Sequence, residues 1–331
     1  MPQHSSILSL LYSSSRPASM QSSALVFLSF FCLMAVGYLW RYLPRVPDGG
    51  TVRSSIGALV LNILLPALTF KTLYAAPIGN DLWQVPLTSI FVCSISVVIS
   101  FVAYSLYQRI APSTSRATIG ALILASSWGN VAYLGLPVVS ALVGVEYQRI
   151  PILFDLLGMT PLLWSFGVVI AVHYGSPDDD RHPILHGIAT LRRLPPIYAA
   201  LMGLLCNVLH LPVHPAFLHA CNLASDAVAP LMMISVGIAL RWHGLHRLVP
   251  AFPALLIKLV VAPVLGITIA QLLGMTDSSL RATIIESAMP TMLLTMVVAE
   301  RFHLDTDILA FVIAVSTVVS FISVPFFASL V

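Results

Sequence analysis

The chain has 331 residues, of which 58% are hydrophobic and only 9% are charged, with a net charge of +3 and a mean hydropathy of +0.94. Soluble globular domains carry about 25% charged residues, so this composition excludes an ordinary water-facing surface. The basic residues form no block and no stripe, which argues against a nucleic-acid partner. We therefore expect a protein that is embedded in the lipid bilayer.

The N-terminal 23 residues are polar and rich in serine, which predicts a tail over residues 1–23, with Met20 as a second candidate start. The apolar run that follows, 24–43, is longer than the ~7–15 residues of a signal-peptide core, and no small-residue cleavage site follows it. We expect it to be a retained first helix.

Ten apolar runs separated by short polar stretches predict an all-α protein with ten transmembrane helices, because about 20 apolar residues cross a hydrocarbon core ~30 Å thick. The predicted spans are 24–43, 54–75, 85–107, 117–142, 150–172, 196–211, 218–240, 248–273, 280–299 and 307–329. The fourth and ninth spans, and less clearly the second, carry Gly, Asn or Pro in their middles and are expected to be interrupted.

The polar segment 174–195 divides the chain into a first five-helix repeat, 24–173, and a second, 196–331. An odd number of helices per half inverts the second half relative to the first, a common plan of secondary transporters. One internal echo, Asn62-x-x-x-Pro66 and Asp226-x-x-x-Pro230, falls in matching helices of the two halves. With 23 prolines in the chain, this echo is also compatible with coincidence.

Orientation follows from the basic residues, because cytoplasmic loops hold an excess of Lys and Arg. Eleven of the sixteen lie after odd-numbered spans: Arg41, Arg45, Arg53, Arg109, Arg116, Arg181, Arg192, Arg193, Arg241, Arg247 and Arg301. This predicts a multi-pass protein of the cytoplasmic (inner) membrane, with both termini on the outer side and the segment 174–195 in the cytoplasm.

Polar residues stand four positions before a proline at Asn62, Asp226 and Glu286. Proline clashes with the carbonyl four residues back, and in lipid a freed carbonyl needs a partner in protein or in a water-filled cavity. A capped kink and an ion or substrate site both fit this pattern. We expect these three residues to be candidates for ion or proton coupling, with Glu286 as the proton carrier.

The centres of the fourth and ninth spans combine helix breakers with polar groups. Asn130, Gly135 and Pro137 lie in the fourth span, and Pro290 and Thr291 lie in the ninth. Broken helices that cross at the midplane present positive N-termini, which favour an anion, and free carbonyls, which favour a cation. We expect these five residues to bind the substrate.

Lys258 and Glu286 are the deepest ionisable residues by sequence position, where a charge is costly and usually functional. Lys258 is a candidate counter-ion for a substrate carboxylate, a candidate partner for Glu286, or a lysine that reaches the interface with its long side chain. Asp155 and Asp226 lie nearer the ends of their spans, within expected reach of headgroup water.

Other chemistry is not indicated. The four cysteines are scattered and predict packing roles, and His210, His214 and His219 surround a turn and predict a wet loop rather than a metal site. The sequence holds no H-E-x-x-H, G-x-S-x-G or nucleotide-binding pattern. We expect no enzymatic activity, no cofactor and no metal.

The chain resembles the auxin efflux carrier family from its first helix to its last. The motifs that carry the resemblance are Leu61-Asn62-Ile63-Leu64-Leu65-Pro66-Ala67-Leu68, Trp128-Gly129-Asn130, Leu134-Gly135-Leu136-Pro137, Leu194-Pro195-Pro196-Ile197, Ala229-Pro230-Leu231, Ser235-Val236-Gly237, Ala288-Met289-Pro290 and Val298-Ala299. Their order and spacing, rather than any single motif, make the resemblance specific.

The resemblance implies two inverted five-helix repeats, similar to those of bile-acid symporters and sodium/proton antiporters. It also implies a scaffold domain and a moving transport domain, and it is compatible with a homodimer. By position, Asn130 and Pro137 match the first crossover of the family and Pro290 matches the second. No asparagine stands beside Pro290, where plant auxin carriers have one, which argues against auxin as the substrate. The short central loop resembles bacterial members, some of which are associated with malonate or other small carboxylates.

The resulting hypothesis is a secondary transporter of a small organic anion, with a proton or sodium as the coupling ion. Two alternatives remain open. One is a membrane sensor or receptor with a transporter fold. The other is a cation/proton exchanger. The paired acidic residues expected at the midplane of such an exchanger are not evident in the sequence, which argues against it.

Overall fold

The computed structural model describes residues 20–43, 46–175, 192–240 and 247–330. All regular structure in these ranges is helical, apart from one isolated β-bridge between Gly129 and Thr291. Helical segments lie in each of the ten predicted spans, and their ends differ from the predicted ends by a few residues. The central segment lies largely outside the described residues, between helices that end at Tyr174 and begin at Pro195.

The first half contains, in order, α2 (Met20–Leu39), η1 (Trp40–Tyr42), α3 (Gly49–Leu59), η2 (Val60–Leu64), α4 (Leu65–Ala75), α5 (Asp81–Ile110), α6 (Arg116–Ser127), η3 (Val131–Gly135), α7 (Leu136–Leu142), η4 (Val145–Tyr147), α8 (Arg149–Phe154), η5 (Asp155–Met159), α9 (Thr160–Leu162), η6 (Leu163–Gly167) and α10 (Val168–Tyr174). The second half contains α12 (Pro195–Val208), α13 (Pro215–Asp226), α14 (Val228–Ala239), α15 (Leu248–Leu256), η8 (Ile257–Val261), α16 (Ala262–Leu272), α17 (Asp277–Ser287), α18 (Thr295–Arg301) and α19 (Thr306–Ala328).

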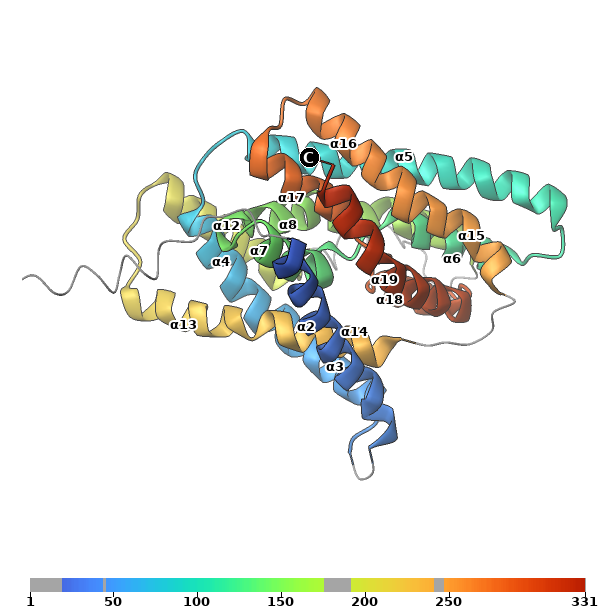
Figure 1. The fold of residues 1–331 in the computed structure, drawn as a ribbon, viewed down its shortest axis with the longest axis horizontal. Helices are drawn as coiled ribbons and strands as arrows, with labels where there is room; N and C mark the ends of the chain where they lie inside the picture. The colour runs from blue at the N-terminus through green and yellow to red at the C-terminus, as the bar shows by residue number, and fades with distance from the viewer. Residues whose placement is uncertain (1–19, 44–45, 176–191, 241–246, 331) are drawn as a thin grey trace, which may run out of the picture.

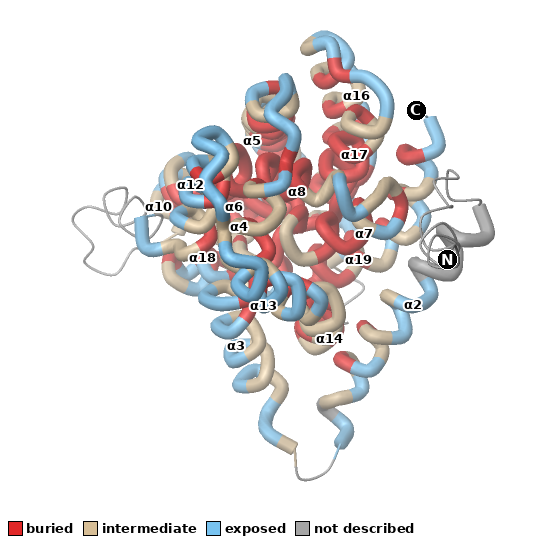
Figure 2. Tube along the Cα trace, turned by 90° about the vertical axis from the view of Figure 1, so that its left-hand side faces the viewer, coloured by how far each residue is buried: buried red, intermediate tan, exposed pale blue. Residues whose placement is uncertain are grey.

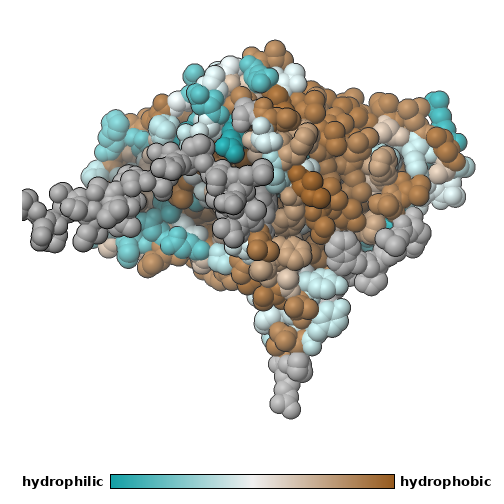
Figure 3. Space-filling view, in the orientation of Figure 1, coloured by the Kyte–Doolittle hydropathy of each residue, from teal (hydrophilic) through white to brown (hydrophobic). Residues whose placement is uncertain are grey.

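Six of the described helices are long and apolar enough to cross a bilayer: Gly49–Ala75, Asp81–Ile110, Val145–Tyr174, Pro215–Ala239, Leu248–Leu272 and Thr306–Ala328. Shorter apolar helices occupy Leu28–Leu39, Arg116–Ser127, Val131–Leu142 and Pro195–Val208. Large apolar side chains point outward, with Leu272 80% and Ile322 76% exposed. Figure 3 shows a broad hydrophobic area on the face that is turned toward the viewer, with hydrophilic residues toward its margins. These features define a multi-pass membrane protein.

Wide π-helical turns recur just before prolines. The turns η2, η3, η5 and η8 each end two residues before a proline, namely Pro66, Pro137, Pro161 and Pro263. Proline removes an N–H and crowds the carbonyl four residues back, and a wider turn accommodates both. The predicted interruption of the second span is therefore wrong: residues 49–75 form one continuous helix in which η2 absorbs Pro66.

The fourth and ninth spans are interrupted, as predicted. Helix α6 ends at Ser127 and helical structure resumes at Val131, whereas α17 ends at Ser287 and α18 begins at Thr295. At the N-terminus the first helix begins a few residues before the predicted start of the first span, 24–43. Helix α2 begins at Met20, so its first turn extends into the polar stretch that was expected to be a tail.

The helices pack in two groups (Figure 1). The flanking group consists of α2, α3–α4, α12 and α13–α14, in which α2 packs on α14 and α4 packs on α12. The crossing group consists of α5, α6–α7, α8–α10, α15–α16, α17–α18 and α19. Figure 2 shows buried residues concentrated in the crossing group around α6, α8 and α17, and exposed residues along the outer ends of α2 and α3.

Candidate functional site

The two interrupted helices cross at their breaks and pair there like two short antiparallel strands. The Asn130 N–H donates to the Pro290 carbonyl at 2.7 Å, and the Met292 N–H donates to the Trp128 carbonyl at 2.9 Å. These two bonds satisfy backbone groups that unwinding would otherwise leave unpaired in a buried place. The sequence predicted both breaks, and the tertiary structure brings them together.

The break in the ninth span is anchored by a threonine. Thr291 is fully buried, its Oγ1 donates to the Ala125 carbonyl at 2.7 Å, and its N–H donates to Ser316 Oγ at 3.2 Å. These bonds tie the second break to α6 and to α19. Thr291, predicted to bind substrate, is thus already engaged in hydrogen bonds within the protein.

The break in the fourth span carries an unsatisfied amide. Asn130 is 3% exposed, and its Nδ2 has no hydrogen-bond partner among the described residues. Asn130 also immediately precedes the 12-residue helical stretch 131–142, whose N-terminal end is electropositive. A buried donor of this kind calls for a ligand or an ordered water.

Lys258 lies close to both helix breaks. It is fully buried, and its Nζ donates to the Ser287 carbonyl, the last of α17, at 3.2 Å. A cation at a helix C-terminus stabilises the negative end of the helix dipole. A Cβ at Gly129 would lie 3.2 Å from the same Nζ, so glycine leaves room for the lysine.

Glu286 is fully buried on α17, and neither of its carboxyl oxygens has a hydrogen-bond partner among the described residues. A Cβ added at Gly135 would lie 2.2 Å from Glu286 Oε2, so the glycine of the fourth span makes space for the carboxyl group of the ninth. Glu286 interacts electrostatically with Lys258, although the two form no direct ion pair within the described structure.

The remaining predicted residues divide into two sets. Pro137 and Pro290 are buried near the crossing, where Pro290 accepts the bond from Asn130. Asn62 and Asp226 lie elsewhere: both are exposed, and Asn62 Nδ2 donates to the Ala58 carbonyl of its own helix at 2.8 Å. The structure therefore brings seven of the nine candidates to the crossing and leaves these two on the flanking group.

A pocket of about 430 Å³ lies between the two groups of helices. Its lining comes from α3, η3, α14, the second break and α18: Gly50, Arg53, Ser54, Gly57, Tyr133, Ser235, Leu293, Leu294, Val297 and Glu300. Pockets of ~300–1,000 Å³ suit small-molecule ligands. The C-terminal sides of both breaks thus form one wall of a ligand-sized space.

Arg53 supplies the positive charge in this pocket. It is half-buried, and none of the described residues forms a hydrogen bond or an ion pair with its guanidinium group. Sequence reasoning counted Arg53 as a loop charge and missed its position, because nothing in the local pattern distinguishes it from other loop arginines. Only the packing of α3 against α14 directs it into the pocket.

Asp155 was also missed. Its position near a span end predicted access to headgroup water, but the residue is only 6% exposed, because the neighbouring helices of the crossing group cover it. Thr160 Oγ1 donates to Asp155 Oδ1 at 3.0 Å. The only sequence signal was indirect: Asp155 stands six residues before Pro161 and opens the wide turn η5.

Among the residues that the structure describes, no group of three or more His, Cys, Asp or Glu side chains could hold a metal ion. The polar groups at the crossing are instead single donors and acceptors on a ligand-sized pocket. A multi-pass helical protein in which broken helices border such a pocket has the layout of a membrane transporter.

The chain belongs to the membrane transport protein family, whose model matches residues 23–176 and 187–328; this is the auxin efflux carrier family that the motifs predicted. It is 28% identical, over 304 residues, to an uncharacterized transporter of Methanothermobacter thermautotrophicus, covering 90% of this chain and 95% of the relative. It is 26% identical, over 269 residues, to an uncharacterized transporter of Methanocaldococcus jannaschii, covering 79% and 84% respectively. The protein is therefore a membrane transporter by family.

Proposed function

We propose that the protein is a secondary transporter that moves a small organic anion, such as a short carboxylate, across the cytoplasmic membrane by alternating access. The observation that carries this proposal is the Arg53 guanidinium, which has no hydrogen-bond or ion-pair partner among the described residues, in a 430 Å³ pocket bordered by both helix breaks. Guanidinium binds a carboxylate through two parallel hydrogen bonds. The buried amide of Asn130, at the edge of the same crossing, is a second donor for the anion.

Alternating access is supported by the way the two halves pack. If the chain is two inverted repeats of five spans, residues 24–173 and 196–331, then α2 matches α12 and α3–α4 matches α13–α14. The contacts agree with that pairing, because α2 packs on α14 and α4 packs on α12. Helices α2 and α14 also approach each other closely at two glycines. Gly37 lies against the backbone carbonyl three residues before Gly237, and Gly237 lies against the backbone carbonyl three residues before Gly37. On this plan the flanking group is the scaffold and the crossing group is the moving domain.

The orientation follows from the basic residues, with both termini outside and Arg53 on the cytoplasmic side. The pocket then opens toward the cytoplasm, and the proposed state is inward-facing. Glu286 is the proposed proton carrier, because its carboxyl group has no hydrogen-bond partner among the described residues. Such a group inside a membrane protein is costly when charged, and a bound proton removes that cost.

The direct test is uptake of labelled malonate and related short carboxylates into proteoliposomes, with and without an inward proton gradient. Arg53→Gln should lower uptake about tenfold or more, because a hydrogen bond to a charged group contributes about 1.5–3 kcal/mol. Glu286→Gln should remove the response to the gradient. The matched control is Arg109→Gln, an exposed arginine at the end of α5.

Equal loss of uptake in the Arg53 and Arg109 variants would contradict a specific role for the pocket. Tight binding of a carboxylate without flux would favour the sensor alternative.

A cation/proton exchanger is a second candidate, favoured by one specific observation. Sequence reasoning found no paired acids, but Asp155 and Glu286 are both buried and interact electrostatically. Sodium-dependent proton movement in vesicles that contain no organic solute would support the exchanger. Its absence, together with carboxylate uptake, would support the anion carrier.

A further inference from the structure

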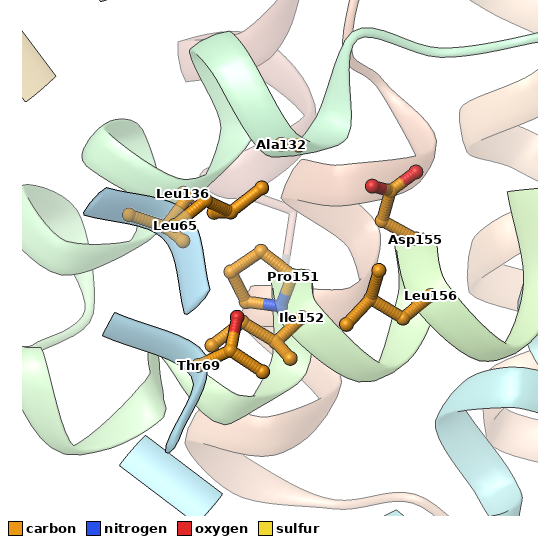
Figure 4. A pocket seen from close by; sticks show the side chains of 8 residues that line it. All are labelled: Leu65, Thr69, Ala132, Leu136, Pro151, Ile152, Asp155 and Leu156. Carbon is orange, nitrogen blue, oxygen red and sulfur yellow. The ribbon is translucent and has the colours of Figure 1, made fainter. Parts of the chain in front are cut away.

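Asp155 lines a small cavity that the transport proposal does not use. The cavity has a volume of about 10 Å³, which is room for about one water molecule. Figure 4 shows Asp155 and Thr69 on two walls of this cavity, with Pro151 between them. The Thr69 hydroxyl is fully buried without a hydrogen-bond partner among the described residues, so a water molecule in the cavity would satisfy it.

One helical turn, η3, connects this cavity with the pocket and with Glu286. Ala132 lines the cavity beside Asp155, Tyr133 lines the pocket, and Gly135 lies against the Glu286 carboxyl group. Asp155 interacts electrostatically with both Tyr133 and Glu286. The single turn η3 therefore borders the cavity that Asp155 lines, the ligand-sized pocket and the buried acid of the ninth span.

The charges of this buried cluster balance only when the two acids carry one proton between them. Lys258 is a single cation, whereas Asp155 and Glu286 together offer two negative charges. Two like charges in a buried site are costly, and an unpaired buried charge is costly too. Among the other titratable groups of the packed elements, Tyr133 on η3 interacts with Asp155 and Cys93 on α5 interacts with Lys258. Arg149 on α8 is paired with Asp81 on α5.

We propose that Asp155 and Glu286 share a single proton, and that Asp155 is the place where this proton enters and leaves. A hydronium ion at the cavity gives its proton to an Asp155 carboxylate oxygen and becomes water. When the proton moves on to Glu286, Asp155 is left as the carboxylate, so one negative charge balances Lys258 whichever acid holds the proton; when the proton leaves to water, both acids are carboxylates. The role of this proton transfer as the coupling step of transport rests on the proposed function. The sharing of the proton can be tested without any substrate.

The test is the modification of buried carboxyl groups by dicyclohexylcarbodiimide, which reacts with the protonated form of the carboxyl group. The sample is the purified full-length protein in lipid vesicles. Labelled residues are identified by peptide mass spectrometry across a pH series. In the wild type, both Asp155 and Glu286 should be labelled in part, and each should lose label with rising pH, by up to about tenfold per pH unit above the midpoint.

The variants test the sharing. In Glu286→Gln, Asp155 alone must balance Lys258, so its labelling at a given pH should fall several-fold; in Asp155→Asn, the labelling of Glu286 should fall in the same way. Asp226→Asn removes an exposed carboxyl group of the flanking group and should change neither. The pH series on the wild type needs no variant, so a folding defect in a variant does not block the test.

Two results would overturn the inference. One is labelling of Asp155 that is the same with and without Glu286, and the other is no labelling of Asp155 at a pH where Glu286 is labelled. Failure of carboxylate uptake with the expected labelling pattern would instead reject the anion substrate and leave the shared proton in place.

Discussion

The break in the fourth span and the break in the ninth span meet at one β-bridge, but their polar side chains are bonded to different degrees. Thr291 uses its hydroxyl group and its N–H within the protein, on α6 and α19. Asn130 uses its N–H but keeps an amide donor with no partner among the described residues. From this difference we propose a division of labour, in which Thr291 of the ninth-span break holds the crossing together and Asn130 of the fourth-span break is left available to bind a ligand.

The largest effect on stability is expected from Lys258→Met, which removes the charge between the two breaks. It leaves the Ser287 carbonyl and the Glu286 carboxyl group uncompensated, and breaking a buried ionic interaction costs about 3–5 kcal/mol. Thermal unfolding in detergent measures the loss. Lys258→Met combined with Glu286→Gln should recover part of it; no recovery would mean that the lysine acts only as a helix cap.

A smaller loss is expected from Gly135→Ala. The new Cβ would lie 2.2 Å from Glu286 Oε2, and overpacking of this kind costs about 1–3 kcal/mol. The matched variant is Gly129→Ala, whose Cβ would lie 3.2 Å from Lys258 Nζ, a less severe approach, and its effect should be milder. If Gly129→Ala proves the more destabilising of the two in the same unfolding measurement, the carboxyl group is not packed against the fourth span as described.

Thr291→Val keeps the shape of the side chain and removes its hydroxyl group. The loss of the bond to the Ala125 carbonyl should destabilise the protein by about 1 kcal/mol. Ligand-induced stabilisation by a transported carboxylate should persist in this variant, because the division of labour gives Thr291 a structural role. Loss of the ligand response with unchanged stability would reverse the roles of the two breaks.

The smallest effect on stability is expected from Asn130→Ala, because its Nδ2 makes no hydrogen bond with the described residues. The unfolding temperature of the ligand-free protein should stay close to that of the wild type, whereas the stabilisation by a bound carboxylate should be lost. A ligand response equal to that of the wild type would remove Asn130 from the proposed site.

The sequence alone determined where helical structure lies and where it breaks. Apolar runs of membrane length and the residues Gly, Asn and Pro act locally, so the ten helical regions and the interruptions near Asn130 and Pro290 could be read from the chain. The spaced motifs also predicted the family. The second span shows the limit of local reading, because a single π turn absorbs Pro66 and the helix continues.

Only the tertiary structure decided which polar groups meet. The Gly129–Thr291 bridge, the approach of Glu286 to Gly135 and the position of Arg53 in the pocket join segments far apart in sequence. Hydropathy reports whether a segment suits lipid, but it does not say which helix covers a given side chain. For that reason Asp155 looked accessible at the end of its span and is in fact buried, because α5 and α8 pack against the turn that carries it.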